Sequence, residues 1–153
     1  MKLLNEFVIK GSPSTVTAQQ KGLKIIRGTP IFYEKPEVTK AKNLIKSELI
    51  FKAPEEPYEG PLCVRIMWLF DKKTLTKKEN KTFKVSYPDL DNMAKGFLDI
   101  CTELHIWKDD NCISKLELEK AWCREFQGTF VQIWQMEEHD FDTYVLGWRD
   151  RVT

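Results

Sequence analysis

The stretch that says most about this chain reads PDLDNMAK and runs from Pro88 to Lys95. Two carboxylates, Asp89 and Asp91, stand where an apolar pattern with a helical period begins, and aspartate is a favoured N-cap residue. Lys95 follows Asp91 by four residues, which is about one helical turn. The stretch therefore predicts a helix whose first turns display two acids and one lysine.

The predicted helix extends from Asp89 to about residue 104. Its buried face is marked by one apolar stripe, which consists of Leu90, Ala94, Phe97, Cys101 and Leu104. Three charged residues spaced by fours occupy another face, namely Asp91, Lys95 and Asp99.

A second acidic pair, Asp109-Asp110, lies just before a predicted strand. If that strand is adjacent to the helix, Asp110 can face Asp89 and Asp91 at one end of the helix. Carboxylates about 4 Å apart repel by roughly 4 kcal/mol per pair at an effective dielectric constant of about 20. Such a cluster needs a proton, a basic partner or a hard cation, and Mg²⁺ prefers carboxylate oxygens.

Each of these residues also has a purely structural explanation. Asp89 can act as an N-cap, Asp91 and Lys95 can form a weak surface ion pair, and the second acidic pair can be a polar turn. The functional interpretation instead places the Lys95 ammonium on a phosphate oxygen, or near the oxygen that leaves, where it stabilises developing negative charge.

The remaining pattern predicts a single α+β domain over residues 1–153, with a mixed or antiparallel sheet packed against two main helices. Residues 15–30 are predicted to form a loop around a short strand at 23–27. Residues 71–84 are predicted to be an exposed lysine-rich hairpin or loop, and the tail from residue 137 is either a short helix or irregular. Strands are predicted at 3–10, 62–70, 113–124 and 129–136, and the other helix at 36–52.

Charge is distributed unevenly along the chain. Residues 1–88 carry 17 Lys and Arg against 9 Asp and Glu, whereas residues 89–153 carry 7 against 14. A basic half joined to an acidic half suggests an anion-binding surface beside a cation-binding site, although a solvated surface explains the same numbers. The candidate phosphate contacts are Lys73, Lys77 and Lys78 in the predicted loop, followed by Lys40, Lys42 and Lys46 in the predicted helix.

Composition excludes several classes of protein. No apolar run approaches the ~20 residues that cross a bilayer, so no membrane partner is expected. Asn5 and Glu6 interrupt the apolar stretch that a signal peptide needs. The four cysteines form no Cys-x-x-Cys pair, which argues against a zinc site and favours reduced thiols in a cytoplasmic protein.

Two runs, PDLDNMAKGFLD at 88–99 and WKDDNCISKLELEK at 107–120, closely resemble RusA-type Holliday-junction resolvases. The family pattern is an Asp-x-Asp-Asn-x-x-Lys helix start, an Asp four residues after the Lys, and a downstream Asp-Asp. The chain departs from the family after Pro13-Ser14, where threonines and then lysines replace an arginine-rich stretch. The departure bears on junction selectivity more than on catalysis.

The resemblance implies a small homodimer that binds four-way or branched DNA and cuts two symmetric strands in a Mg²⁺-dependent reaction, with Mn²⁺ as a substitute. By position, Asp89, Asp91 and Asp110 would be the metal ligands and Lys95 the catalytic lysine. The implied role is DNA recombination and repair, commonly in a phage or prophage. Two alternatives stay open: a branched-DNA-binding protein of the same fold with little or no cleavage, and a phosphohydrolase acting on small phosphate esters.

Overall fold

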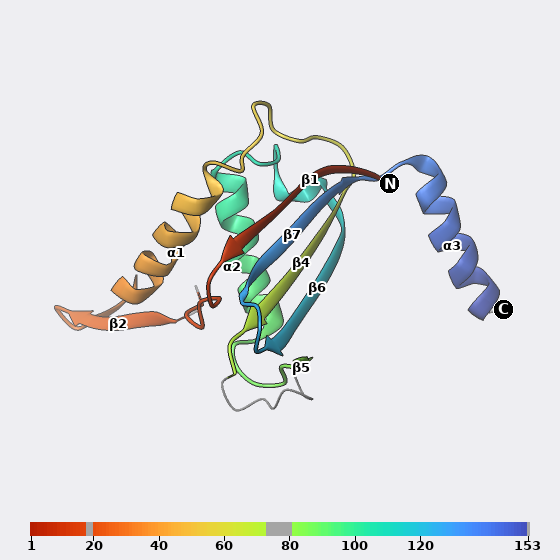
Figure 1. Ribbon diagram of the computed structural model, residues 1–153. Helices are drawn as coiled ribbons and strands as arrows, with labels where there is room; N and C mark the ends of the chain where they lie inside the picture. The colour runs from red at the N-terminus through yellow and green to blue at the C-terminus, as the bar shows by residue number, and fades with distance from the viewer. Residues whose placement is uncertain (18–19, 73–80, 153) are drawn as a thin grey trace.

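The computed structural model describes residues 1–17, 20–72 and 81–152, and Figure 1 shows an α+β fold built on a mixed sheet. The five strands lie in the order β1-β7-β4-β6-β5. β4 and β6 are parallel, and the other neighbours are antiparallel. The strand bounds are Lys2–Lys10 for β1, Leu62–Phe70 for β4, Lys81–Phe83 for β5, Ile113–Cys123 for β6 and Gly128–Gln135 for β7.

Two helices, α1 (Pro36–Leu49) and α2 (Leu90–Glu103), cover one face of this sheet. The strand β4 alternates, so that every second residue is buried towards the helices: Leu62, Val64, Ile66, Trp68 and Phe70. The ring of Trp68 meets that of Phe97 from α2 edge to face, with centroids 6.4 Å apart. The apolar stripe predicted for α2 therefore faces the core, where Ala94, Phe97 and Cys101 are buried.

The predicted strands and the helix at 89–104 are confirmed to within one residue at most ends. The helix α1 begins at Pro36 as predicted but ends at Leu49, three residues earlier than expected. An isolated hairpin replaces most of the predicted loop at 15–30, with β2 at Lys21–Ile26 and β3 at Thr29–Glu34. Its turn residues Arg27 and Gly28 both have positive φ, which two-residue hairpin turns favour.

The tail forms a third helix, α3 (Glu138–Val152), which is the helical one of the two alternatives predicted for it. In Figure 1 it projects from the end of the sheet, away from α1 and α2. In the part of the chain that the structure describes, no helix combines the length and apolar character that crossing a membrane requires.

Candidate active site

The start of α2 presents two unengaged carboxylates. Asp89 occupies the N-cap position, but its side chain makes no capping hydrogen bond; only its backbone carbonyl accepts a bond, from Met93 N at 3.1 Å. Asp91 lies in the first turn, and both acids are exposed. The helix dipole favours negative charge at this end. Because no described residue bonds to either carboxylate, both are available to bind a cation.

Lys95 lies one turn further along α2 and is also exposed. The surface ion pair with Asp91 is absent among the described residues, as is any other partner for the Lys95 ammonium. Side chains spaced by four on a helix have Cβ atoms about 5–6 Å apart. The ammonium could therefore reach a phosphate oxygen beside a cation that the Asp91 carboxylate binds.

Asp110 lies at the opposite end of α2. It opens a short 3-10 turn, Asp110–Cys112, that leads directly into β6. The 14 residues of α2 span about 21 Å at 1.5 Å per residue. The strand β6 gives a similar separation between Asp89 and Asp110. The Lys120 ammonium donates to Pro88 O, next to Asp89, whereas Asp110 lies close to Ile113. Lys120 and Ile113 are roughly 23 Å apart along the strand.

The expected meeting of three carboxylates at one end of the helix is therefore not formed within one chain. Figure 1 shows the reason: α2 runs the full height of the sheet before the chain turns into β6 and returns. A metal ion binds carboxylate oxygens at about 2 Å, so Asp110 cannot share an ion with Asp89 in the same chain.

The surroundings of Asp110 are those of a polar turn. The Asp109 carboxylate accepts a hydrogen bond from Asn111 N at 2.9 Å, whereas Asp110 is exposed. Trp107, which precedes the acidic pair in the sequence, does not cover this turn. It is fully buried, and its indole N–H donates to Thr102 Oγ1 at 2.8 Å.

Two lysines bind the segment that enters α2. The Lys84 ammonium donates to Ser86 Oγ at 2.8 Å, to Ser86 O at 3.1 Å and to Tyr87 O. The Lys120 ammonium donates to Ser86 O at 2.9 Å and to Pro88 O at 2.6 Å. Lys84 was predicted to be in an exposed loop, but it is 4% exposed, and burial lowers its pKa, with a smaller effect from the charge of Lys120.

A family model described as Endodeoxyribonuclease RusA matches residues 13–134 of this chain. The chain belongs to the RusA endodeoxyribonuclease family. It is therefore an endonuclease. A relative named crossover junction endodeoxyribonuclease RusA, from Lactococcus phage r1t, is 32% identical over 121 residues, which cover 79% of this chain and 89% of the relative. The RusA match includes the start of α2 and the second acidic pair, but it excludes α3.

The lysines predicted to contact DNA have different environments in this RusA-family chain. On α1, Lys42 pairs with Glu34 at 2.9 Å and Lys46 pairs with Glu103 at 2.6 Å. Lys40 is exposed, and no described residue pairs with it. The remaining three candidates lie outside the described residues, namely Lys73, Lys77 and Lys78.

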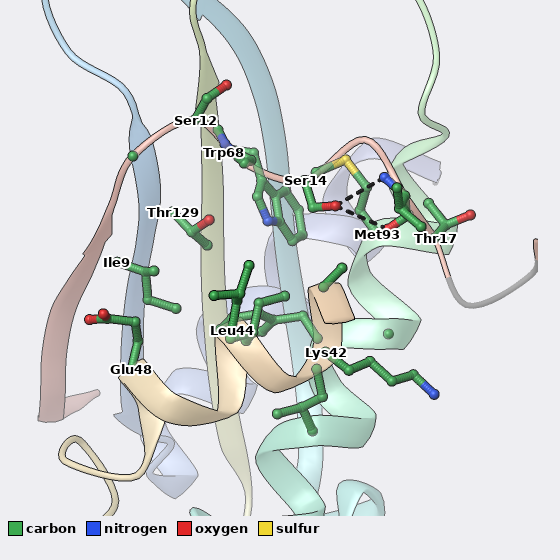
Figure 2. A pocket seen from close by; sticks show the side chains of 18 of the residues that line it. Ile9, Ser12, Ser14, Thr17, Lys42, Leu44, Glu48, Trp68, Met93 and Thr129 are labelled. Carbon is green, nitrogen blue, oxygen red and sulfur yellow. Dashed lines mark hydrogen bonds between the residues drawn. The ribbon is translucent and has the colours of Figure 1, made fainter. Parts of the chain in front are cut away.

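A cavity of about 450 Å³ borders α2 but is not the carboxylate site. Figure 2 shows its walls, with Ser14 from the loop after β1, Leu44 from α1, and Trp68 behind them. Asn92 and Met93 line it, whereas Asp89 and Asp91 do not. The largely apolar lining makes this cavity unsuited to holding a metal ion.

One other acidic group was not anticipated from the sequence. Glu137, His139 and Asp140 are the only three candidate ligands that approach within 4.8 Å of one another among the described residues. The N-terminal amine already pairs with Asp140 at 2.8 Å and with Glu137 at 3.7 Å. A cation is therefore already present in this group.

Proposed function

We propose that this RusA-family endonuclease cuts four-way and related branched DNA by paired nicks in a reaction that requires a divalent cation. The observation that carries the proposal is the start of α2, where Asp89, Asp91 and Lys95 are exposed and lack partners among the described residues. The relative from Lactococcus phage r1t is named as a crossover junction endodeoxyribonuclease, which supports the same substrate class.

The donor set fits a hard cation. Asp89 and Asp91 offer carboxylate oxygens to which no side chain within residues 1–17, 20–72 and 81–152 bonds, and Mg²⁺ prefers such ligands and keeps several waters. When bound, Mg²⁺ or Mn²⁺ would withdraw charge from a phosphodiester and stabilise the oxygen that leaves. Lys95 would donate to a phosphate oxygen on the same side of α2, because no acid among the described residues neutralises its ammonium.

We further propose that the third ligand, Asp110, comes from a second copy of the chain. Asp110 lies about 20 Å from Asp89, at the other end of α2. A two-fold axis that sets two α2 helices antiparallel would bring Asp110 of each chain to the acids of its partner. Such a homodimer has two equivalent sites, which suits two symmetric cuts in a four-way junction.

The hairpin of β2 and β3 supports association of two chains. It has six apolar side chains exposed, of which Ile25 at 73% and Phe32 at 69% are the most accessible. A two-stranded hairpin is marginally stable in water without further packing. Its exposed apolar surface is explained if a second chain covers it.

Contact with DNA is assigned to the basic half of the chain. On α1 the proposed contacts are Lys40, Lys42 and Lys46, where the last two would exchange their carboxylate partners for phosphate. Lys73, Lys77 and Lys78 are proposed on sequence grounds alone. Four free cysteines support action in the cytoplasm, in DNA recombination and repair, and the phage relative supports a phage or prophage setting.

The test is a synthetic four-way junction with each strand labelled in turn, incubated with and without Mg²⁺. The proposal predicts paired, symmetric nicks with Mg²⁺ and none with a chelator. Asp91→Asn should bind the junction and leave it uncut. Junction binding without Mg²⁺-dependent nicking by the natural sequence would instead establish the alternative of a branched-DNA-binding protein.

A further inference from the structure

Three consecutive backbone carbonyls immediately before Asp89 are held by lysine ammonium groups. Lys84 binds the carbonyls of Ser86 and Tyr87, and Lys120 binds those of Ser86 and Pro88. The Ser86 hydroxyl accepts a further bond from Lys84, at 2.8 Å. The irregular segment that leads into the proposed metal ligand is thereby fixed by five hydrogen bonds from two side chains. Lys84 lies just before the segment, after β5, and Lys120 belongs to β6.

The position of Lys84 is costly for a charged group. Its side chain is buried, and its ammonium lies 5.1 Å from the centre of the Phe70 ring and 4.4 Å from that of Trp122. No acid among the described residues neutralises it, and Lys120 brings a second positive charge to the Ser86 carbonyl. Buried charges normally have a partner of opposite sign, so a purely structural loop would be stabilised better by neutral donors.

We propose that Lys84 and Lys120 are positioning residues for the metal site, which hold the 86–88 segment so that the Asp89 carboxylate is aimed correctly for a cation. The inference rests on the proposed function. The ammonium groups act through the segment itself, because among the described residues all of their hydrogen bonds go to residues 86–88 and none to Asp89. Because the backbone at Asp89 is already ordered, a cation that binds there does not have to offset the loss of backbone entropy, and its affinity is higher.

The geometry makes Lys120 the better residue to substitute. It is only partly buried, and methionine keeps most of its apolar stem while removing the ammonium. Lys72 supplies a matched control, because its ammonium also lies over the Trp122 ring, at 5.5 Å, but no bond joins it to the 86–88 segment. Lys72→Met therefore removes a neighbouring positive charge and leaves the carbonyls bound.

The experiment is calorimetric titration of the full chain with Mg²⁺ alone, together with junction cleavage as a function of Mg²⁺ concentration. Loss of a residue that orients a metal ligand typically weakens metal binding about 10–100-fold. Lys120→Met should therefore raise the Mg²⁺ dissociation constant at least about tenfold. Lys120→Arg should restore most of the affinity, because a guanidinium can donate to both carbonyls. Lys72→Met should bind Mg²⁺ like the natural sequence.

Lys84→Met provides a second variant that removes three of the five bonds, measured under conditions where circular dichroism shows it folded. It should weaken Mg²⁺ binding in the same direction as Lys120→Met. Unchanged Mg²⁺ affinity in both folded variants would overturn the inference, even if their melting temperatures fall. A natural sequence that neither binds Mg²⁺ nor cuts junctions would overturn the proposed function instead, so the two failures are distinct.

Discussion

Removal of the Lys95 ammonium should slow cleavage strongly without destabilising the fold. Lys95 is exposed on α2, and the structure contains no Asp91–Lys95 ion pair to lose. Lys95→Ala should therefore change the free energy of unfolding by no more than about 0.5 kcal/mol, as is usual for surface substitutions. Alanine is also the strongest helix former, so α2 should remain intact.

The expected loss of rate follows from electrostatics. An ammonium about 5 Å from developing negative charge, at an effective dielectric constant of about 20, stabilises that charge by roughly 3 kcal/mol. At about 1.4 kcal/mol per factor of ten, its removal should slow the chemical step about 140-fold. This lies within the range of about 10²–10³ found when an oxyanion donor is removed from an active site.

The assay is single-turnover cleavage of a labelled four-way junction at saturating enzyme, so that weaker DNA binding cannot be mistaken for slower chemistry. Lys2→Ala is a matched control, because it removes one exposed positive charge from β1, far from the start of α2. Lys95→Arg tests geometry, since a guanidinium is broader and flatter than an ammonium. If Lys95→Ala cleaves the junction as fast as the natural sequence does, the role assigned to Lys95 is refuted.

Three further predictions concern metal, DNA and pH. Mg²⁺ should raise the melting temperature of the natural sequence, because a ligand that binds only the folded state stabilises it, and Asp91→Asn should lose most of this gain in a thermal-shift measurement. Junction affinity should fall with salt on a log–log slope of about −0.9 per neutralised phosphate on duplex arms, and a flatter slope is expected after glutamine replaces Lys73, Lys77 and Lys78. The hydrogen bond from Lys42 holds the pKa of Glu34 below its ordinary value of 4.5, so the pair stabilises the fold above that value and stops doing so as pH falls through the lowered pKa. The difference in unfolding free energy between the natural sequence and Lys42→Gln, only a few tenths of a kcal/mol for such exposed groups, should vanish in chemical denaturation near pH 2.

The elements that were predicted correctly are those whose signals are local. The strand at Leu62–Phe70 alternates buried and partly exposed side chains, and α2 follows a helical period after an acidic start. The second strand of the hairpin was missed because Pro30 and the exposed apolar residues of β3 do not form the alternating pattern of a half-buried strand. Its turn depends on a positive φ at Arg27, a residue without a strong preference for that conformation.

The candidate site could be predicted only in part. Which residues take part can be inferred from neighbouring positions in the sequence, whereas how they are arranged depends on tertiary structure. The residues at the start of α2 were found from spacing, whereas the place of Asp110 depends on which end of α2 the chain leaves. Lys84 was grouped with a solvated charge run, and only the pairing of β5 with β6 buries it. Its bonds to Ser86 and Tyr87 are local, but they depend on an irregular backbone that no periodic pattern predicts.

The most direct test of the account mixes two inactive chains. Asp91→Asn and Asp110→Asn should each abolish cleavage when present alone, because every site then lacks one ligand. If Asp110 acts in the partner's site, a mixed dimer contains one site with Asp89, Asp91 and Asp110 all intact. Co-expressed, differently tagged chains purified as the mixed dimer should therefore regain Mg²⁺-dependent nicking of one strand per junction. A mixed dimer as inactive as either parent would contradict the shared site.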